Sequence, residues 1–159
     1  MIILGIDPGS RVTGYGVVSK TSKGLSHIDH GEIKPSRSSP LSLSLKNIFE
    51  GVMDVVEKRC PDVLAIETIF YGKNVRSLIQ QGHVRGVALL VGPLKGLEVY
   101  EYSPLEIKQA VVGYGRAEKH QVQHMVKTLL RLPLPPPTDA SDALAIAICH
   151  AHTMGKEPV

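Results

Sequence analysis

The chain begins with the apolar run IILGID (residues 2–7), which ends in Asp7 and is followed by a Pro-Gly turn. A short apolar run bounded by turn residues predicts a buried strand. Two further strand patterns follow over residues 13–19 and 25–34, with a Ser-Lys-Gly turn between them. We therefore expect an antiparallel meander whose first strand is buried and carries an acid at its end.

Helical and strand patterns alternate through the rest of the chain. Apolar residues at helical spacing predict helices, and short apolar runs between turn residues predict strands. Three strands, then helix, strand, helix, strand and further helices, is an α/β order in which helices cover both faces of a mixed five-stranded sheet. The expected helices span residues 41–60, 74–91, 104–112, 117–132 and 139–152, and the two later strands span 63–66 and 97–102.

Single residues mark the ends of two of these helices. Ser103 and Pro104 suit the N-cap and first position of a helix. Thr138 can cap the last helix, which is apolar on nearly every side over residues 143–149 and must therefore be buried. We expect His150 and His152 to mark where this helix reaches the surface.

The composition predicts one folded domain without a membrane segment. A length of 159 residues suits a single domain with a sizeable core, and we expect residues 1–159 to form it. The chain has no run of about 20 apolar residues that could span a bilayer and no secretory signal pattern. Cys60 and Cys149 belong to no C-x-x-C pair, so we expect reduced thiols and a cytoplasmic protein.

Positive charge is concentrated in the middle of the chain. The net charge is only +3, too small by itself to indicate a nucleic-acid-binding protein. Residues 70–131 nevertheless hold nine Lys or Arg against four Glu, whereas the remainder holds nine against eleven acids. This distribution suits either a surface for an anionic partner or ordinary solvated charges.

Four acids stand at the ends of predicted elements. Asp7 and Glu67 end apolar strands, and strand ends of an α/β sheet gather where ligands bind. Asp139 and Asp142 are three residues apart, so they share one face of a helix. Each acid alone has an ordinary explanation as a turn residue, a solvated strand end or a complement to the helix dipole. Together, the four carboxylates can converge at one rim of the sheet.

Converging carboxylates need a cation. Like charges raise one another's pKa, and a divalent ion removes that cost. Oxygen ligands favour Mg²⁺, or Mn²⁺ in its place, over zinc. Two such ions, about 4 Å apart, would hold a phosphodiester, activate a water and stabilise the leaving oxygen. The acids therefore indicate nuclease or phosphotransfer chemistry.

Several short motifs resemble those of one enzyme family. They are GIDPG followed by TGYGV, AIE before a Phe, VVGYG-x-AEK with QVQHMV, and DASDALAIAICHAH, in that order from residue 1 to about residue 152. On these motifs the chain resembles the RuvC family of Holliday junction resolvases. The resemblance implies a ribonuclease-H-like fold and a homodimer that uses Mg²⁺ to nick two opposing strands of a four-way DNA junction in recombination and repair.

The resemblance also implies roles for individual residues. The catalytic, metal-binding acids of the family fall on Asp7, Glu67, Asp139 and Asp142. Its junction-contacting residues fall on Phe70, Lys108 and Lys119. An aromatic ring can stack on an unpaired base and ammonium groups can neutralise phosphates, although a core Phe and solvated lysines are ordinary alternatives. The helix over residues 74–91 is the family's dimer element, and family members work with RuvA and RuvB.

Other functions fit parts of the sequence. The GIDPG turn is similar to the first phosphate hairpin of actin-like ATPases and sugar kinases, but 159 residues cannot supply their two lobes. A non-catalytic junction-binding module has no need of four carboxylates, which repel DNA phosphates unless a metal compensates. Another ribonuclease-H-like nuclease, acting on RNA hybrids or flaps, stays open on physical grounds, and only the family motifs argue against it.

Overall fold

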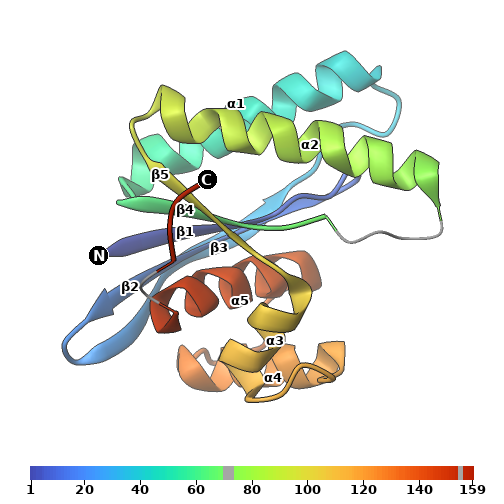
Figure 1. Cartoon of the computed structure of the whole chain (residues 1–159). Coiled ribbons are helices and arrows are strands. Elements are labelled where there is room, and N and C mark those ends of the chain that lie inside the picture. The colour runs from blue at the N-terminus through green and yellow to red at the C-terminus, as the bar shows by residue number, and fades with distance from the viewer. Residues whose placement is uncertain (70–73, 154–155) are drawn as a thin grey trace.

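One mixed sheet lies at the centre of the computed structural model, which describes residues 1–69, 74–153 and 156–159 (Figure 1). Its strands are β1 (Ile2–Asp7), β2 (Thr13–Thr21), β3 (Gly24–Ile33), β4 (Val63–Glu67) and β5 (Glu98–Tyr102). They are ordered β3-β2-β1-β4-β5; β1 pairs antiparallel with β2 and parallel with β4. The predicted meander and mixed five-stranded sheet are confirmed.

Helices cover both faces of the sheet, as predicted (Figure 1). The helices are α1 (Leu41–Arg59), α2 (Val75–Leu94), α3 (Pro104–Val112), α4 (Lys119–Leu129) and α5 (Thr138–His152). Apolar residues of α1 and α2 pack on one face with Leu4 and Ile6 of β1. Those of α3, α4 and α5 pack on the other with Ile3, because successive strand side chains point to opposite faces.

Helix α5 lies against the sheet with almost no side-chain layer between the two backbones. A Cβ atom added at Gly5 of β1 would overlap the carbonyl oxygen of Ala143, and one added at Gly14 of β2 would overlap that of Asp139. Gly14 pairs directly with Asp7 across the two strands. The glycines therefore bring the first turns of α5 down onto the end of β1 that carries Asp7.

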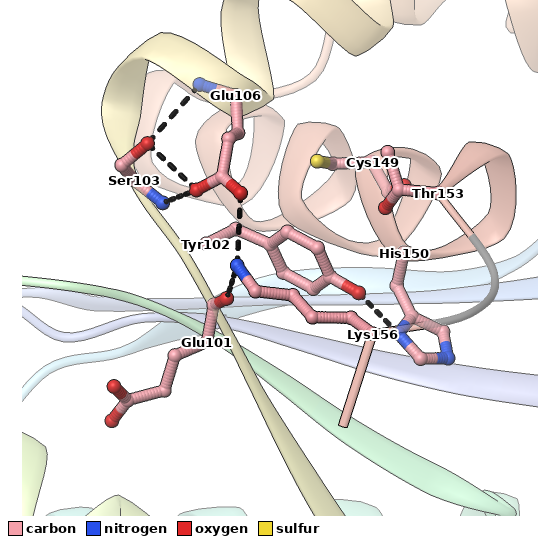
Figure 2. Close-up of polar contacts among 8 residues, drawn as sticks. All are labelled: Glu101, Tyr102, Ser103, Glu106, Cys149, His150, Thr153 and Lys156. Carbon is pink, nitrogen blue, oxygen red and sulfur yellow. Dashed lines mark hydrogen bonds and ion pairs between the residues drawn. The ribbon is translucent and has the colours of Figure 1, made fainter. Parts of the chain in front are cut away.

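The last helix differs in two details from the sequence-based expectation. Thr138 does not cap α5: Pro137 occupies the N-cap position without a side-chain cap, and its carbonyl accepts a hydrogen bond from Ser141 N at 2.8 Å, so Thr138 is already helical. His152 is exposed, as predicted, but His150 does not reach the surface. It is 5% exposed, and its Nδ1 lies 2.8 Å from the Tyr102 hydroxyl (Figure 2). None of the described helices is long and apolar enough to cross a membrane.

Replacing Gly5 with Ala should destabilise the fold by about 1 to 3 kcal/mol, because the new methyl group must displace backbone atoms of α5. Urea denaturation followed by circular dichroism measures the free energy of unfolding. Ser26→Ala, a small change at an exposed position of β3, is the control and should stay within about 0.5 kcal/mol of the parent. Equal stabilities for Gly5→Ala and the control would contradict the close approach of α5.

Candidate active site

Asp7 and Glu67 end two neighbouring strands at the same edge of the sheet. Strands β1 and β4 are parallel, and Ile6 pairs with Ile66, so the acids that follow are adjacent. Since side chains alternate along a strand, both acids point to the face that Ala65 shares with α5. The strand register thus sets two carboxylates side by side beneath the start of that helix.

A cavity of about 330 Å³ gathers three of the four predicted acids, Asp7, Glu67 and Asp142. Lys108 of α3 and Lys119 of α4 line the same cavity. The rest of its wall is mainly apolar and comes from α3, α4 and α5: Pro104, Ile107, Val122, Ala145 and Ile146. The pocket therefore combines charged groups of both signs with apolar side chains.

The fourth acid, Asp139, lies beside this cavity rather than in its wall. Its negative charge is close enough to help raise the pKa of Asp7 and of Asp142. Of the two acids predicted to share a face of the last helix, Asp142 therefore lines the cavity and Asp139 does not. Phe70, predicted to contact DNA, lies outside the described residues.

Burial and mutual repulsion hold the carboxyl groups far from their ordinary titration range. Burial, followed by the charges of Asp142, Glu67 and Asp139, raises the pKa of Asp7 to about 8. Burial, with the charge of Asp142, raises the pKa of Glu67 to about 7. Burial also raises the pKa of Asp142, although Lys119 opposes the shift. Ionising all three near neutral pH therefore requires added positive charge.

Lys119 supplies part of that positive charge. Its Nζ lies 2.8 Å from the Asp142 Oδ2. Burial alone would lower the pKa of Lys119, but the hydrogen bond and charge of Asp142, together with the charge of Asp7, raise it. The Lys108 ammonium opposes the rise in the pKa of Glu67 and Asp142 in the same way. In this structure Lys119, predicted as a DNA contact, is thus an ion-pair partner of an acid.

Helix starts determine where the two lysines stand. Helix α3 begins directly after β5 with the predicted Ser103 cap: Glu106 N donates to Ser103 Oγ at 3.3 Å, and Ser103 N donates to Glu106 Oε2 at 2.7 Å (Figure 2). Lys156 adds an ion pair to Glu106 at 2.9 Å. This fixed first turn of α3 precedes Lys108 by only a few residues.

Helix α4 is shorter than the helix predicted over residues 117–132. Glu118 stands at its N-cap, where the backbone N–H donates to Gln121 Oε1 at 2.8 Å. Lys119 is consequently the first helical residue, at the mouth of the cavity. Beyond the other end, Arg131 has a φ of 51°, a left-handed conformation that the helix cannot continue through.

The sequence-based reading missed the apolar wall of the cavity, although a signal for it exists. Ala145 and Ile146 follow Asp142 by three and four residues, and Ile107 and Pro104 stand one and four residues before Lys108. Residues at helical spacing of three or four from a functional side chain share its face. Applied to Asp142, that rule would have found two of the wall residues.

The carboxylates of the cavity are the type of ligand that a hard divalent cation prefers. Their raised pKa values are those that a nearby cation would lower. Within the parts of the chain that the structure describes, no three or more His, Cys, Asp or Glu side chains are grouped so that they could hold an ion as they stand. The Lys119 ammonium engages Asp142, one of the three carboxylates of the cavity.

Comparison with known proteins decides the family. The family model described as crossover junction endodeoxyribonuclease RuvC matches residues 3–150 of the chain. The chain belongs to the RuvC family. RuvC of Syntrophotalea carbinolica is 53% identical over 152 residues, covering 96% of this chain and 94% of that protein. RuvC of Desulforamulus reducens is 50% identical over 152 residues, covering 95% and 93%.

A solved RuvC structure shares the whole architecture. Thermus thermophilus RuvC, solved in complex with a Holliday junction substrate, aligns with a TM-score of 0.92 and 33% identity, covering 100% of this chain and 99% of that chain. The ribonuclease-H-like fold implied by the motifs is therefore confirmed. RuvC-family nucleases are metal-dependent, which agrees with an acidic cavity rather than a phosphate-binding hairpin at Asp7.

Without divalent cations, stability should fall as the pH rises from 5 to 8. An unfolded chain ionises Asp7 near its ordinary pKa of 3.8, whereas the folded protein retains the proton up to about 8, so the folded state binds more protons in this interval. Asp7→Asn removes this contribution. The free energy of unfolding of the variant, minus that of the parent, should therefore be larger at pH 8 than at pH 5 by on the order of 2 kcal/mol.

Urea denaturation in EDTA at the two pH values measures this difference. Asp54→Asn is the matched control, because Asp54 is an exposed acid of α1 that pairs only loosely with Lys58, at 3.6 Å. It should follow the parent at both pH values. An Asp7→Asn variant with the same pH dependence as the parent would contradict the raised pKa of Asp7.

Proposed function

We propose that this chain resolves Holliday junctions by metal-dependent hydrolysis of one phosphodiester bond in each of two opposing strands. The observation that carries the proposal is the cavity in which three strand-end and helix acids meet Lys108 and Lys119. Membership of the RuvC family supports the reaction, and the Thermus thermophilus RuvC complex with a Holliday junction supports the substrate. Residues 1–159 act as one nuclease domain in this account.

The four acids are the proposed metal ligands and catalytic residues. Asp7, Glu67, Asp139 and Asp142 bind Mg²⁺, or Mn²⁺ in its place, with two ions per site. When bound, the ions supply Lewis-acid stabilisation of charge on the phosphate and activation of a water. The acids must ionise in a buried site to bind these ions. The raised pKa values of Asp7 and Glu67 mean that this ionisation is unfavourable without a nearby cation.

The two lysines of the cavity are the proposed phosphate contacts. Lys119 neutralises Asp142 while no other cation does so, and its ammonium becomes available to the DNA once the carboxylate has a different partner. Lys108, on α3, also lines the cavity and adds a second positive charge for the scissile strand. Phe70 completes the DNA contacts by stacking on an unpaired base at the junction centre.

Helix α2 is the proposed dimer interface. Four large apolar side chains along it are more than half exposed: Val75, Ile79, Leu90 and Leu94. Their spacings of 4, 11 and 4 residues keep them on one face of a helix, which a second copy can cover. A two-fold dimer would offer two equivalent sites to a substrate with approximate two-fold symmetry. RuvA and RuvB as partners, and a cytoplasmic location, complete the proposal on the strength of the family.

Asp7→Asn should abolish Mg²⁺-dependent cutting, by at least about 1,000-fold, because it removes a ligand and with it several kcal/mol of charge stabilisation. Junction affinity should stay the same or increase, since the substitution deletes a negative charge near the phosphates. The measurement uses a labelled four-way junction, a plain duplex and an RNA hybrid, each incubated with Mg²⁺ or with EDTA.

The parent and the control Asp54→Asn should place paired, symmetric nicks on the junction alone. Cutting by Asp7→Asn at the parental rate would contradict the role of that acid. Comparable cutting of the RNA hybrid by the parent would assign the chain to another ribonuclease-H-like activity. Junction binding without any cutting would leave a non-catalytic module.

A further inference from the structure

A second and larger cavity, of about 720 Å³, is lined in part by the loop that follows Asp7. Its walls come from that loop (residues 10–12), from the loop between β3 and α1 (residues 34–39), from the first turn of α1 and from Gln80 of α2. No residue lines both this cavity and the acidic one, and helices α1 and α2, which contribute to it, cover the face of the sheet opposite to α5. We name it the basic groove.

The charge of the basic groove suits an anion with several negative groups. Arg11, Lys34 and Arg37 line it, and among the described residues of its wall there is no Asp or Glu. Lys34 pairs with Glu32, which leaves the two arginines as the larger unbalanced charge. Four hydroxyl groups add hydrogen-bond donors: Ser10, Ser36, Ser39 and Ser44.

The start of α1 adds to the same field. Leu41 and Ser44 of its first turn line the groove, and Pro40 is the N-cap, which gives the helix no side-chain cap; its first turn holds no acid. The N–H groups at the start of a 19-residue helix carry a partial positive charge that favours phosphate. Helix dipole, guanidinium groups and hydroxyls therefore act on one space.

The groove suits a nucleic-acid backbone better than a free nucleotide. Its described wall contains no aromatic ring on which a base could stack. Arginine, lysine, hydroxyl groups and helix N-termini are the groups that contact phosphates, and such contacts position a duplex without reading its sequence. The chemistry thus matches a chain of phosphodiesters.

The groove also lies close to the site of cutting along the chain. Ser10 is three residues from Asp7, and consecutive Cα atoms are 3.8 Å apart, so the two Cα atoms are separated by at most about 11 Å. Phosphates of one DNA strand follow one another at about 3.4 Å along the helix axis. The near wall of the groove is therefore within about three nucleotides of a phosphate held at Asp7.

We propose that the basic groove binds the DNA backbone of the cut strand, at phosphates within about three nucleotides of the scissile bond. This inference rests on the proposed function. It adds a second DNA-contact surface, without acids in its described wall and separate from Lys108 and Lys119. The groove holds the strand in position, while the acidic cavity performs the reaction.

The test is the salt dependence of junction binding in EDTA, where no cutting occurs. The triple variant Arg11→Ala/Lys34→Ala/Arg37→Ala should reduce the slope of log K against log [NaCl] by about 1.8 to 2.7, at about 0.9 for each lost phosphate contact, with the lower value if Lys34 stays paired with Glu32 in the complex. The single variants Arg11→Ala and Arg37→Ala should each reduce it by about 0.9, so the test survives if the triple variant folds poorly.

The matched control removes the same charge at the far end of the sheet. Lys23, Lys58 and Lys95 lie in the turn after β2, in the last turn of α1 and after α2, next to the strand ends remote from Asp7. Their triple alanine variant should keep the parental slope. A junction with neutral methylphosphonates at the three positions on either side of the scissile bond should lower the parental slope, and should lower the slope of the groove variant by less, because only the contacts of Lys108 and Lys119 are left to lose.

Two results would overturn the inference. If the groove variant has the same salt slope as the control variant, the groove does not contact DNA. If that variant has also lost the parent's binding to a polyglutamate peptide, the groove binds an acidic protein segment instead. Fully additive losses from the variant and the methylphosphonates would place the contact elsewhere on the DNA. A parent that binds and cuts the junction under these outcomes keeps the proposed function, whereas a parent that does neither overturns both.

Discussion

Helix α5 and the first two strands meet backbone to backbone, because glycines replace the side chains that would hold them apart. Gly5 and Gly14 leave room for the carbonyl groups of Ala143 and Asp139. Two polar chains can pack this closely only because the hydrogen bonds of each are made within its own helix or sheet. The acids at the start of α5 reach the end of β1 as a direct result, so the geometry of the site depends on this contact.

The same contact creates an electrostatic problem. Three carboxyl groups share a cavity walled largely by apolar side chains, and the pKa of Asp7 reaches about 8 because burial and repulsion both oppose ionisation. The pairing of Lys119 with Asp142 offsets part of this cost. The fold therefore offsets part of the repulsion within an acidic site by an internal cation, the Lys119 ammonium.

The sequence predicted the elements whose patterns are local and periodic. Apolar runs ending in Asp7 and Glu67 predicted two strands, which lie parallel and adjacent in the sheet. Because Ile6 pairs with Ile66, the two acids that follow are side by side. The ion pair of Lys119 was not predictable, since charge type does not reveal which neighbour a flexible side chain selects. The basic groove was missed because its loops, rich in Ser and Pro, follow no period.

In the proposed function, acids of α5 and of the strand ends bind the same divalent cations. Crystals of the protein grown with Mn²⁺ and measured at the manganese absorption edge test it directly. We expect an anomalous peak in the acidic cavity within about 2.2 Å of carboxylate oxygens of Asp7, Glu67 and an acid of α5. We also expect that Lys119 has left Asp142. Manganese bound only elsewhere, with the Lys119 ion pair unchanged, would contradict the account.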